Sequence, residues 1–239
     1  MRTYPWSRGA VALAERIFGG ACYLCRGESG GGVICPACAT DLPRLPARRC
    51  PRCALPVDNG GLCGRCLGDP PSYDATIAVF AYAFPADVLI QGLKFRGELA
   101  LAPMLAAELA AQINAAPDSG RRVDLVVPVP LHSVRLRVRG YNQSMEIARA
   151  IAAPLLAPVA ADVCERLRDT PAQVELPWKE RRQNVRGAFS CRRALDGKVI
   201  AVVDDVMTTG ETLNELAAIL KKFGAARVVN WVIARTLAD

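Results

Sequence analysis

The stretch Val199–Leu213, VIAVVDDVMTTGETL, decides the fold of this chain. Residues 199–203 form a short continuous apolar run, which is typical of a parallel strand covered on both faces by helices. Asp204 and Asp205 follow the run directly, and ligands bind at this end of the strands in open α/β sheets. Two adjacent carboxylates at such a position can accept hydrogen bonds from hydroxyl groups or bind a divalent cation.

The residues after the two aspartates suit an anion. Five consecutive positions supply three hydroxyls and a conformationally permissive glycine: Thr208, Thr209, Gly210, Glu211 and Thr212. They precede a helix expected over 213–223, whose free amides and dipole favour an anion. An ordinary strand–helix turn is the alternative, because helix N-caps favour Thr and Asp. Carboxylates and turn together predict a ligand that carries both sugar hydroxyls and a phosphate.

This combination closely resembles the 5-phosphoribosyl 1-diphosphate (PRPP) motif of type I phosphoribosyltransferases. The resemblance implies that Asp204 and Asp205 hold the ribose 2- and 3-hydroxyls, and that residues 208–212 wrap the 5-phosphate. It also implies Mg²⁺ as a companion of PRPP, held mainly by ligand oxygens, because this ion tends to bind through substrate phosphates and few carboxylates.

Length and charge set outer limits on the function. The 239 residues suffice for two unequal domains, and the formal net charge is +7. Zinc bound by eight thiolates would lower that charge to about +3, so charge alone does not predict nucleic-acid binding. No apolar run is long enough to span a bilayer. The spacing of apolar residues over 11–18 predicts a short helix, and Glu15 and Arg16 interrupt any signal-peptide core, so we expect a cytoplasmic protein.

Eight of the ten cysteines form two repeats of CxxC, nine residues, CxxC, placed 28 positions apart. The repeats are Cys22, Cys25, Cys35 and Cys38, and then Cys50, Cys53, Cys63 and Cys66. Two CxxC knuckles complete a closed four-sulfur zinc site, whereas disulfides are disfavoured by the lack of an export signal. The spacing predicts structural zinc, one or two ions, and leaves open whether each repeat binds its own ion or the knuckles pair crosswise.

The proline-bearing stretch 67–75, LGDPPSYDA, is a plausible domain boundary. We therefore expect an N-terminal helix and double zinc ribbon over 1–70 and an α/β domain over 71–239. Further elements are predicted in the second domain: strands over 76–82, 123–127 and 227–233, and helices over 86–93, 99–113 and 144–153. Together they predict about five parallel strands with crossover helices, the last strand lying at or next to a sheet edge.

Several basic and polar residues are candidates for the site. His132, the only histidine, and Arg135 follow a strand end, in a loop that by position resembles the pyrophosphate-contacting loop of phosphoribosyltransferases. They are the catalytic candidates, although a structural hydrogen-bonding role for His132 is equally open. Possible contacts to diphosphate or DNA are Lys94, Arg96, Arg139, Asn142, Arg181, Arg182 and Arg186. Arginine suits phosphate because its guanidinium donates bidentate hydrogen bonds. For Lys94 and Arg96, spacing alone favours a solvated turn.

The segment 166–189 is rich in arginine and contains Trp178. It can be a flap that closes on the diphosphate, a basic surface on which Trp178 stacks with single-stranded nucleic acid, or a solvated loop. Cys164 and Cys191 lack CxxC partners and are expected to be buried or incidental thiols.

The order of these features resembles the ComF family over nearly the whole chain. The motifs that carry the resemblance are the double zinc ribbon, KFRG, PVPLHxxRLRxRGYNQS, LRDTPAQVELPWKERRQNVRGAF and VVDDVMTTGET. Membership implies a phosphoribosyltransferase-like fold in a competence protein that handles incoming single-stranded DNA during natural transformation, beside a helicase or other uptake proteins.

Membership does not establish catalysis, because fold and function separate readily. A phosphoribosyltransferase of nucleotide metabolism is one alternative, although no glutaminase-type domain or base-binding hood is recognisable. A catalytically inactive zinc-ribbon adaptor for a DNA helicase is the other.

Overall fold

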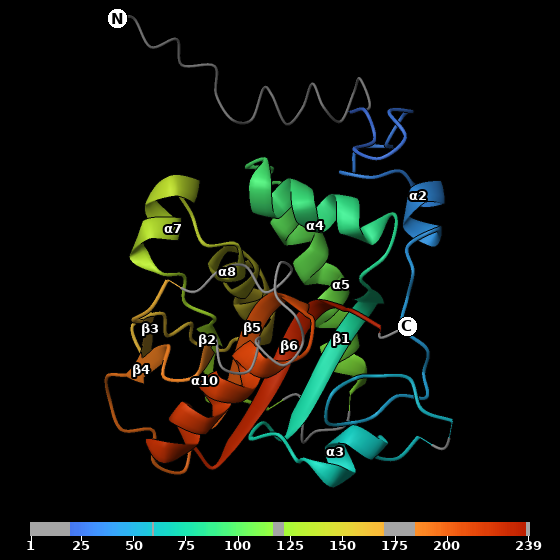
Figure 1. Cartoon of the computed structure of the whole chain (residues 1–239). Coiled ribbons are helices and arrows are strands. Elements are labelled where there is room, and N and C mark those ends of the chain that lie inside the picture. Colours follow the sequence, from blue (N-terminus) through green and yellow to red (C-terminus); the bar gives the residue numbers. More distant parts are fainter. Residues whose placement is uncertain (1–19, 59, 117–121, 170–184, 238–239) are drawn as a thin grey trace, which may run out of the picture.

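The structure is a computed structural model that describes residues 20–58, 60–116, 122–169 and 185–237 (Figure 1). The helix expected within 11–18 lies outside the described residues. So do Trp178, Arg181 and Arg182 of the arginine-rich segment.

The second domain is built on a parallel sheet. Within the described ranges it has four strands in the order β1-β6-β5-β2, where about five were expected. They are β1 (Ala75–Ala81), β2 (Leu125–Pro128), β5 (Val199–Met207) and β6 (Arg227–Arg235). All three pairings are parallel, and β6 lies next to the edge strand β1, as predicted.

Helices cover both faces of this sheet (Figure 1). One face packs against α4 (Ala86–Phe95), α5 (Leu101–Ala115) and α8 (Gln143–Leu155). The other packs against α10 (Glu211–Lys222). Alternate residues of β5 enter the two cores, Ala201 on the first side and Val202 on the second. Because the strand is buried on both faces, its sequence is a continuous apolar run rather than an alternating one.

A second, two-stranded sheet lies beside the parallel one and was not predicted from the sequence. In it, β3 (Cys164–Arg166) pairs antiparallel with β4 (Phe189–Cys191). The short strands pack against the α10 side of the main sheet. Cys164 lies opposite Cys191 in the register, and both are buried, in line with the expectation of buried thiols.

The strand order brings two loops together at the carboxyl ends of neighbouring strands. The loop after β2 leads into α7 (Ser133–Arg139), and the loop after β5 leads into α10. Because β2 and β5 are parallel neighbours, both loops leave from the same end of the sheet. This is the edge where open α/β sheets bind ligands.

The two cysteine repeats fold as separate units that precede the sheet. Each contains one short helix, α2 (Pro36–Thr40) in the first and α3 (Gly64–Gly68) in the second. The first packs against the α4–α5 side through Tyr23, Leu24, Val33 and Ile34. The second enters the α10-side core with Cys50, Cys53 and Cys66. Among the described helices, none combines the length and the hydropathy needed to cross a bilayer.

Candidate functional site

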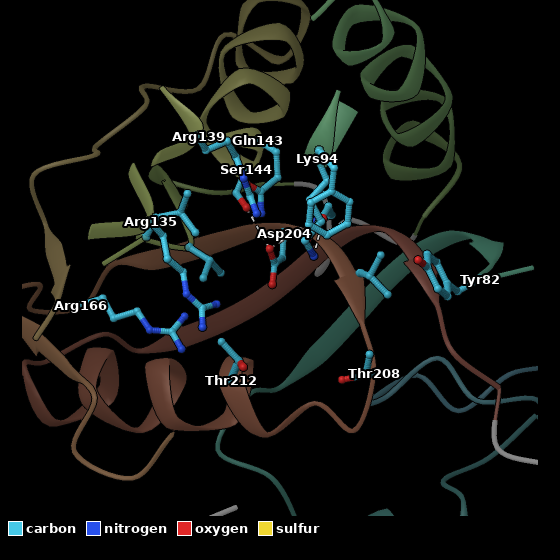
Figure 2. Close-up of a pocket in the computed structure, with 15 residues that line it drawn as sticks. Tyr82, Lys94, Arg135, Arg139, Gln143, Ser144, Arg166, Asp204, Thr208 and Thr212 are labelled. Carbon is cyan, nitrogen blue, oxygen red and sulfur yellow. Dashed lines mark hydrogen bonds and ion pairs between the residues drawn. The ribbon is translucent and has the colours of Figure 1, made fainter. Parts of the chain in front are cut away.

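A cavity of about 190 Å³ opens at the carboxyl end of β5 (Figure 2). Side chains from β5, α4, α7, α8, β3 and the start of α10 line it. They are Tyr82, Lys94, Phe95, Val129, Leu131, Arg135, Arg139, Gln143, Ser144, Arg166, Asp204, Asp205, Val206, Thr208 and Thr212. The cavity therefore contains both predicted aspartates, and Figure 2 shows Thr208 and Thr212 on one side of Asp204 with Lys94 on the other.

The two aspartates are buried and already partnered. Strand β5 continues to Met207, so the aspartates belong to the strand rather than to the turn after it. Ser144, in the first turn of α8, donates a hydrogen bond from Oγ to Asp204 Oδ1 at 2.8 Å. Lys94, near the end of α4, forms an ion pair with Asp205 Oδ2 at 3.0 Å. The interpretation of Lys94 as part of a solvated turn is therefore wrong, because the fold of α4 brings its ammonium against the diacid.

These partners give the two carboxyls different titration behaviour. Burial, and then the charge of Asp205, raise the pKa of Asp204 to about 7. Burial would also raise the pKa of Asp205, but the Lys94 ammonium outweighs it and lowers that pKa. In turn, Asp205 raises the pKa of Lys94. The pair thus offers one fixed carboxylate and one carboxyl that ionises near neutral pH.

The threonine-rich turn begins α10 and has a positive φ at its glycine. Gly210, with φ of 86°, is the N-cap, and Thr209 Oγ1 accepts a hydrogen bond from the Glu211 amide at 3.4 Å. Thr208 and Thr212 line the cavity, whereas Gly210 and Glu211 line a second hollow on the far side of the turn. The free amides of a helix start, with hydroxyls beside them, form an anion-binding arrangement.

Positive charge surrounds the rest of the cavity. Arg135 and Arg139 come from α7 and Arg166 from β3, and burial lowers the pKa of both Arg139 and Arg166. Arg139 donates a hydrogen bond to Gln143 and lies over the ring of Phe95, at 5.4 Å from its centroid. Because guanidinium groups bind phosphate oxygens bidentately, this wall suits a diphosphate or a nucleic-acid backbone.

Other predicted residues lie outside the cavity. His132 caps α7 by accepting a hydrogen bond from the Val134 amide at Nδ1, at 3.4 Å. Asn142 caps α8 and donates to the Val129 carbonyl at 3.0 Å, which fixes the loop between β2 and α7. Arg96 and Arg186 are exposed, and neither is among the residues that line the cavity.

Sequence reasoning missed three contributors to the site. Ser144 and Phe95 reach the cavity because α8 begins and α4 ends beside it, and although both lie in the quoted motifs RGYNQS and KFRG, neither was named as a site residue. Arg235 is 2% exposed and donates hydrogen bonds to the Met207 and Thr208 carbonyls, where the threonine-rich turn begins. The sequence signal that could have identified Arg235 is its position as a charged residue at the end of the apolar strand RVVNWVIAR.

The cysteines resolve the open question of knuckle pairing. Each repeat gathers its own four sulfurs within 4.8 Å of one another, so the knuckles do not pair crosswise. Burial would raise the pKa of Cys22 and Cys50, but backbone amides that donate to their sulfurs outweigh it and lower these values to about 6 and about 7. Four sulfurs gathered at this spacing fit a tetrahedral zinc ion. The chain thus carries two structural zinc sites.

Comparison with known proteins agrees with this architecture. Residues 13–67 match the double zinc ribbon domain, and residues 99–238 match the phosphoribosyl transferase domain. Competence protein F of Haemophilus influenzae is 31% identical over 227 residues, which cover 92% of this chain and 98% of that protein. The chain belongs to the competence protein F family.

Two other relatives extend the family match. The DNA utilization protein YhgH of Salmonella typhimurium is 37% identical over 224 residues, covering 91% of this chain and 98% of the relative. Competence protein ComFC of Bacillus subtilis is 24% identical over 212 residues, covering 85% of this chain and 84% of the relative. The family's double zinc ribbon and phosphoribosyltransferase-type domain are thus both present here.

Proposed function

We propose that this protein acts in DNA utilization or natural competence, and that its second domain binds PRPP with Mg²⁺ at the carboxyl end of β5. One observation carries the proposal: a diacid, a threonine-rich helix start and three arginines converge on a single cavity. Carboxylates there accept hydrogen bonds from ribose hydroxyls, and the turn takes the 5-phosphate. Arg135, Arg139 and Arg166 face the diphosphate. Magnesium is held by diphosphate and ribose oxygens.

Lys94 has a specific part in this proposal. Its ammonium neutralises Asp205 at 3.0 Å, and this keeps a buried carboxylate charged. When ribose hydroxyls donate to the aspartates, we expect the same ammonium to turn toward a diphosphate oxygen. Arg135 and Arg139 then stabilise negative charge on a leaving pyrophosphate, if an acceptor attacks the anomeric carbon.

The test is isothermal titration with PRPP in the presence of Mg²⁺. Asp204→Asn combined with Asp205→Asn removes both negative charges and replaces one acceptor oxygen of each carboxylate by an NH2 donor. The change is expected to weaken binding by at least about 100-fold, at about 1.4 kcal/mol per tenfold. Asp162→Asn is the control, since that side chain is 73% exposed and makes only a 3.8 Å ion pair with Arg193. Absence of binding by the wild type, or equal binding by the double variant, contradicts the proposal.

A second part of the proposal concerns single-stranded DNA. Phe95 is 69% exposed at the cavity, and Lys94 and Arg139 lie over its ring at 5.8 and 5.4 Å. An exposed ring with two cations over it matches the way single-stranded nucleic acids are bound, with bases stacked on aromatics and phosphates on cations. In this proposal PRPP and a DNA strand share the mouth of the cavity.

Fluorescence anisotropy with an oligothymidylate tests this second part. Phe95→Ala is expected to weaken binding about tenfold with an unchanged salt slope, because stacking releases no counterions. Arg181→Ala with Arg182→Ala should weaken binding and flatten the salt slope together. If none of these changes alters affinity, DNA binds elsewhere. Co-purification of a helicase with the full chain, but not with residues 71–239, would favour the adaptor role instead.

A further inference from the structure

The second zinc ribbon lies directly behind the turn Thr208–Thr212, which we call the phosphate turn after its proposed ligand. A polar hollow of about 130 Å³ separates them, lined on one side by Cys53, Cys66 and Tyr73 and on the other by Gly210, Glu211 and Asn214. The turn Thr208–Thr212 therefore has two faces. One faces the cavity with the aspartates, and the other faces a tetracysteine cluster.

Arg235 joins the two sides of this hollow. It is 2% exposed at the end of β6, and its Nε donates to the Cys53 carbonyl at 2.9 Å. Its Nη1 donates to the Met207 carbonyl at 3.0 Å and also to the Thr208 carbonyl. One buried guanidinium thus connects a zinc-ligand residue to the first residue of the turn, and a buried charge of this kind is stable only while its acceptors stay in place.

Further contacts connect the same two elements. Arg65, which lies between Cys63 and Cys66, forms an ion pair with Glu211 at 3.0 Å. The Ser72 amide donates to Asn214 Oδ1 at 2.6 Å. At Gly210 there is no space for a side chain, since a Cβ would lie 3.0 Å from the Tyr73 hydroxyl and 2.6 Å from Met207 Cε. The turn is therefore packed against the ribbon as well as hydrogen-bonded to it.

The Cys53 carbonyl has its position because of the knuckle. The Cys50 amide donates to Leu55 O at 2.7 Å, the Ala54 amide donates to Cys50 O at 2.9 Å, and Ala54 has a φ of 61°. A non-glycine residue in this left-handed region is strained, and the surrounding structure must hold it. Cys50, Cys53, Cys63 and Cys66 would hold a zinc ion that closes the knuckle, and loss of such an ion would free the Cys53 carbonyl to move away from Arg235.

We propose that the second tetracysteine cluster, acting through Arg235, positions the turn Thr208–Thr212, so that zinc in this cluster and an anion in the turn strengthen each other's binding. The identity of that anion as the PRPP 5-phosphate rests on the proposed function. The coupling itself rests only on the contacts above. Because linkage is reciprocal, bound zinc raises the affinity for the anion by the same factor by which the bound anion raises the affinity for zinc.

The first cluster provides the matched control. Its ribbon packs on the other side of the sheet, against the α4–α5 core, and Tyr23 lies over Gly92 of α4. Cys25→Ser and Cys63→Ser each remove one ligand that is not fully buried, the first from the uncoupled cluster and the second from the coupled one.

Hydrogen–deuterium exchange of the 206–214 segment, with zinc content measured in parallel, tests the coupling without PRPP. Cys63→Ser is expected to speed exchange of these amides about tenfold or more, while Cys25→Ser leaves them unchanged. Arg235→Lys should speed exchange while both zinc ions are retained, since it keeps the positive charge but loses the guanidinium donors that reach the Cys53 and Met207 carbonyls together. Unchanged exchange in Cys63→Ser after its zinc is lost, or equal effects from both cysteine variants, overturns the proposal.

A second variant guards against global unfolding. Arg65→Gln removes an ion pair whose arginine side chain is 39% exposed, so the fold should persist, and a two- to threefold rise in exchange of the same amides is expected. Titration with Mg²⁺ and PRPP then separates the two ideas. If the wild type does not bind PRPP but Cys63→Ser still speeds exchange, the proposed function fails and the coupling stands. If PRPP binds equally well to wild type and zinc-depleted Cys63→Ser, the coupling fails alone.

Discussion

The two zinc ribbons have the same cysteine spacing and different structural roles. The first packs on the α4–α5 side of the sheet, and its Cys25 is exposed. The second is part of the α10-side core, where Cys50 and Cys53 are 0% and 3% exposed. The difference shows that a repeated metal motif specifies a local fold, whereas its role depends on which surface it covers. The first ribbon contacts the helix that carries Lys94, and the second contacts the phosphate turn.

The largest expected effect is on stability when a buried ligand is removed. Cys53→Ser should lower the free energy of unfolding by at least about 2 kcal/mol more than Cys25→Ser, because both lose a zinc ligand but only the first leaves a hydroxyl in a packed core. Urea denaturation of the zinc-loaded proteins measures the difference. Equal losses would show that the two ribbons contribute alike.

The next largest effect is expected when alanine replaces either of two tightly packed glycines, Gly210 and Gly92. Gly210→Ala combines a φ of 86° with contact of the new methyl on Met207 and Tyr73, so we expect a loss of about 2–3 kcal/mol and weaker PRPP binding. Gly92→Ala should cost about 1–2 kcal/mol, since its methyl overlaps Tyr23 and lies 2.9 Å from Leu101 Cδ1 while alanine favours the helix. PRPP affinity should remain unchanged in Gly92→Ala. If Gly92→Ala lost PRPP affinity as Gly210→Ala does, the two ribbons would not differ in their effect on the site.

The buried carboxyl of Asp204, which lines the cavity together with Lys94 and Thr208, titrates near neutral pH. The pKa of Asp204 is raised to about 7, so its proton is retained in the folded state and lost in the unfolded state between about pH 4 and 7. Stability from this group is therefore present at low pH and declines as pH rises to 7. Asp204→Asn should be more stable than wild type at pH 8 by more than about 1 kcal/mol, and the gain should vanish near pH 4. Thermal melts across this range provide the measurement, and a gain that is independent of pH would contradict the assignment.

The smallest effect is expected at two exposed ion pairs. Arg44–Glu108 at 2.7 Å and Arg65–Glu211 at 3.0 Å join the cysteine-rich segment to α5 and α10 respectively. Because exposed ion pairs are worth little, Arg44→Gln and Arg65→Gln should each cost about 0.5 kcal/mol or less in unfolding experiments. The two variants should differ in the hydrogen exchange of the amides of the turn Thr208–Thr212, which only Arg65→Gln is expected to speed. If Arg44→Gln did the same, coupling would not be specific to the second ribbon.

Sequence patterns located most elements of the fold to within a few residues. The helix expected over 86–93 is α4, Ala86–Phe95, and the strand expected over 227–233 is β6, Arg227–Arg235. The spacing of apolar residues locates helices and strands because each type of element buries residues at its own interval along the chain. Within the described residues the parallel sheet has four strands where about five were expected, and β3 and β4, with three residues each, form a separate sheet that the sequence patterns did not predict.

The sequence by itself determined the local chemistry of this protein: a diacid followed by a threonine-rich turn, two tetracysteine repeats, and arginines after a strand end. These depend on residues close together in the chain, so spacing reveals them. Only the tertiary structure decided that Lys94 neutralises Asp205, that His132 caps a helix, and that Arg235 connects Cys53 to the phosphate turn across 182 positions of sequence. Such contacts arise from the order in which strands and helices pack, and the sequence around each residue does not encode which distant surface it will meet.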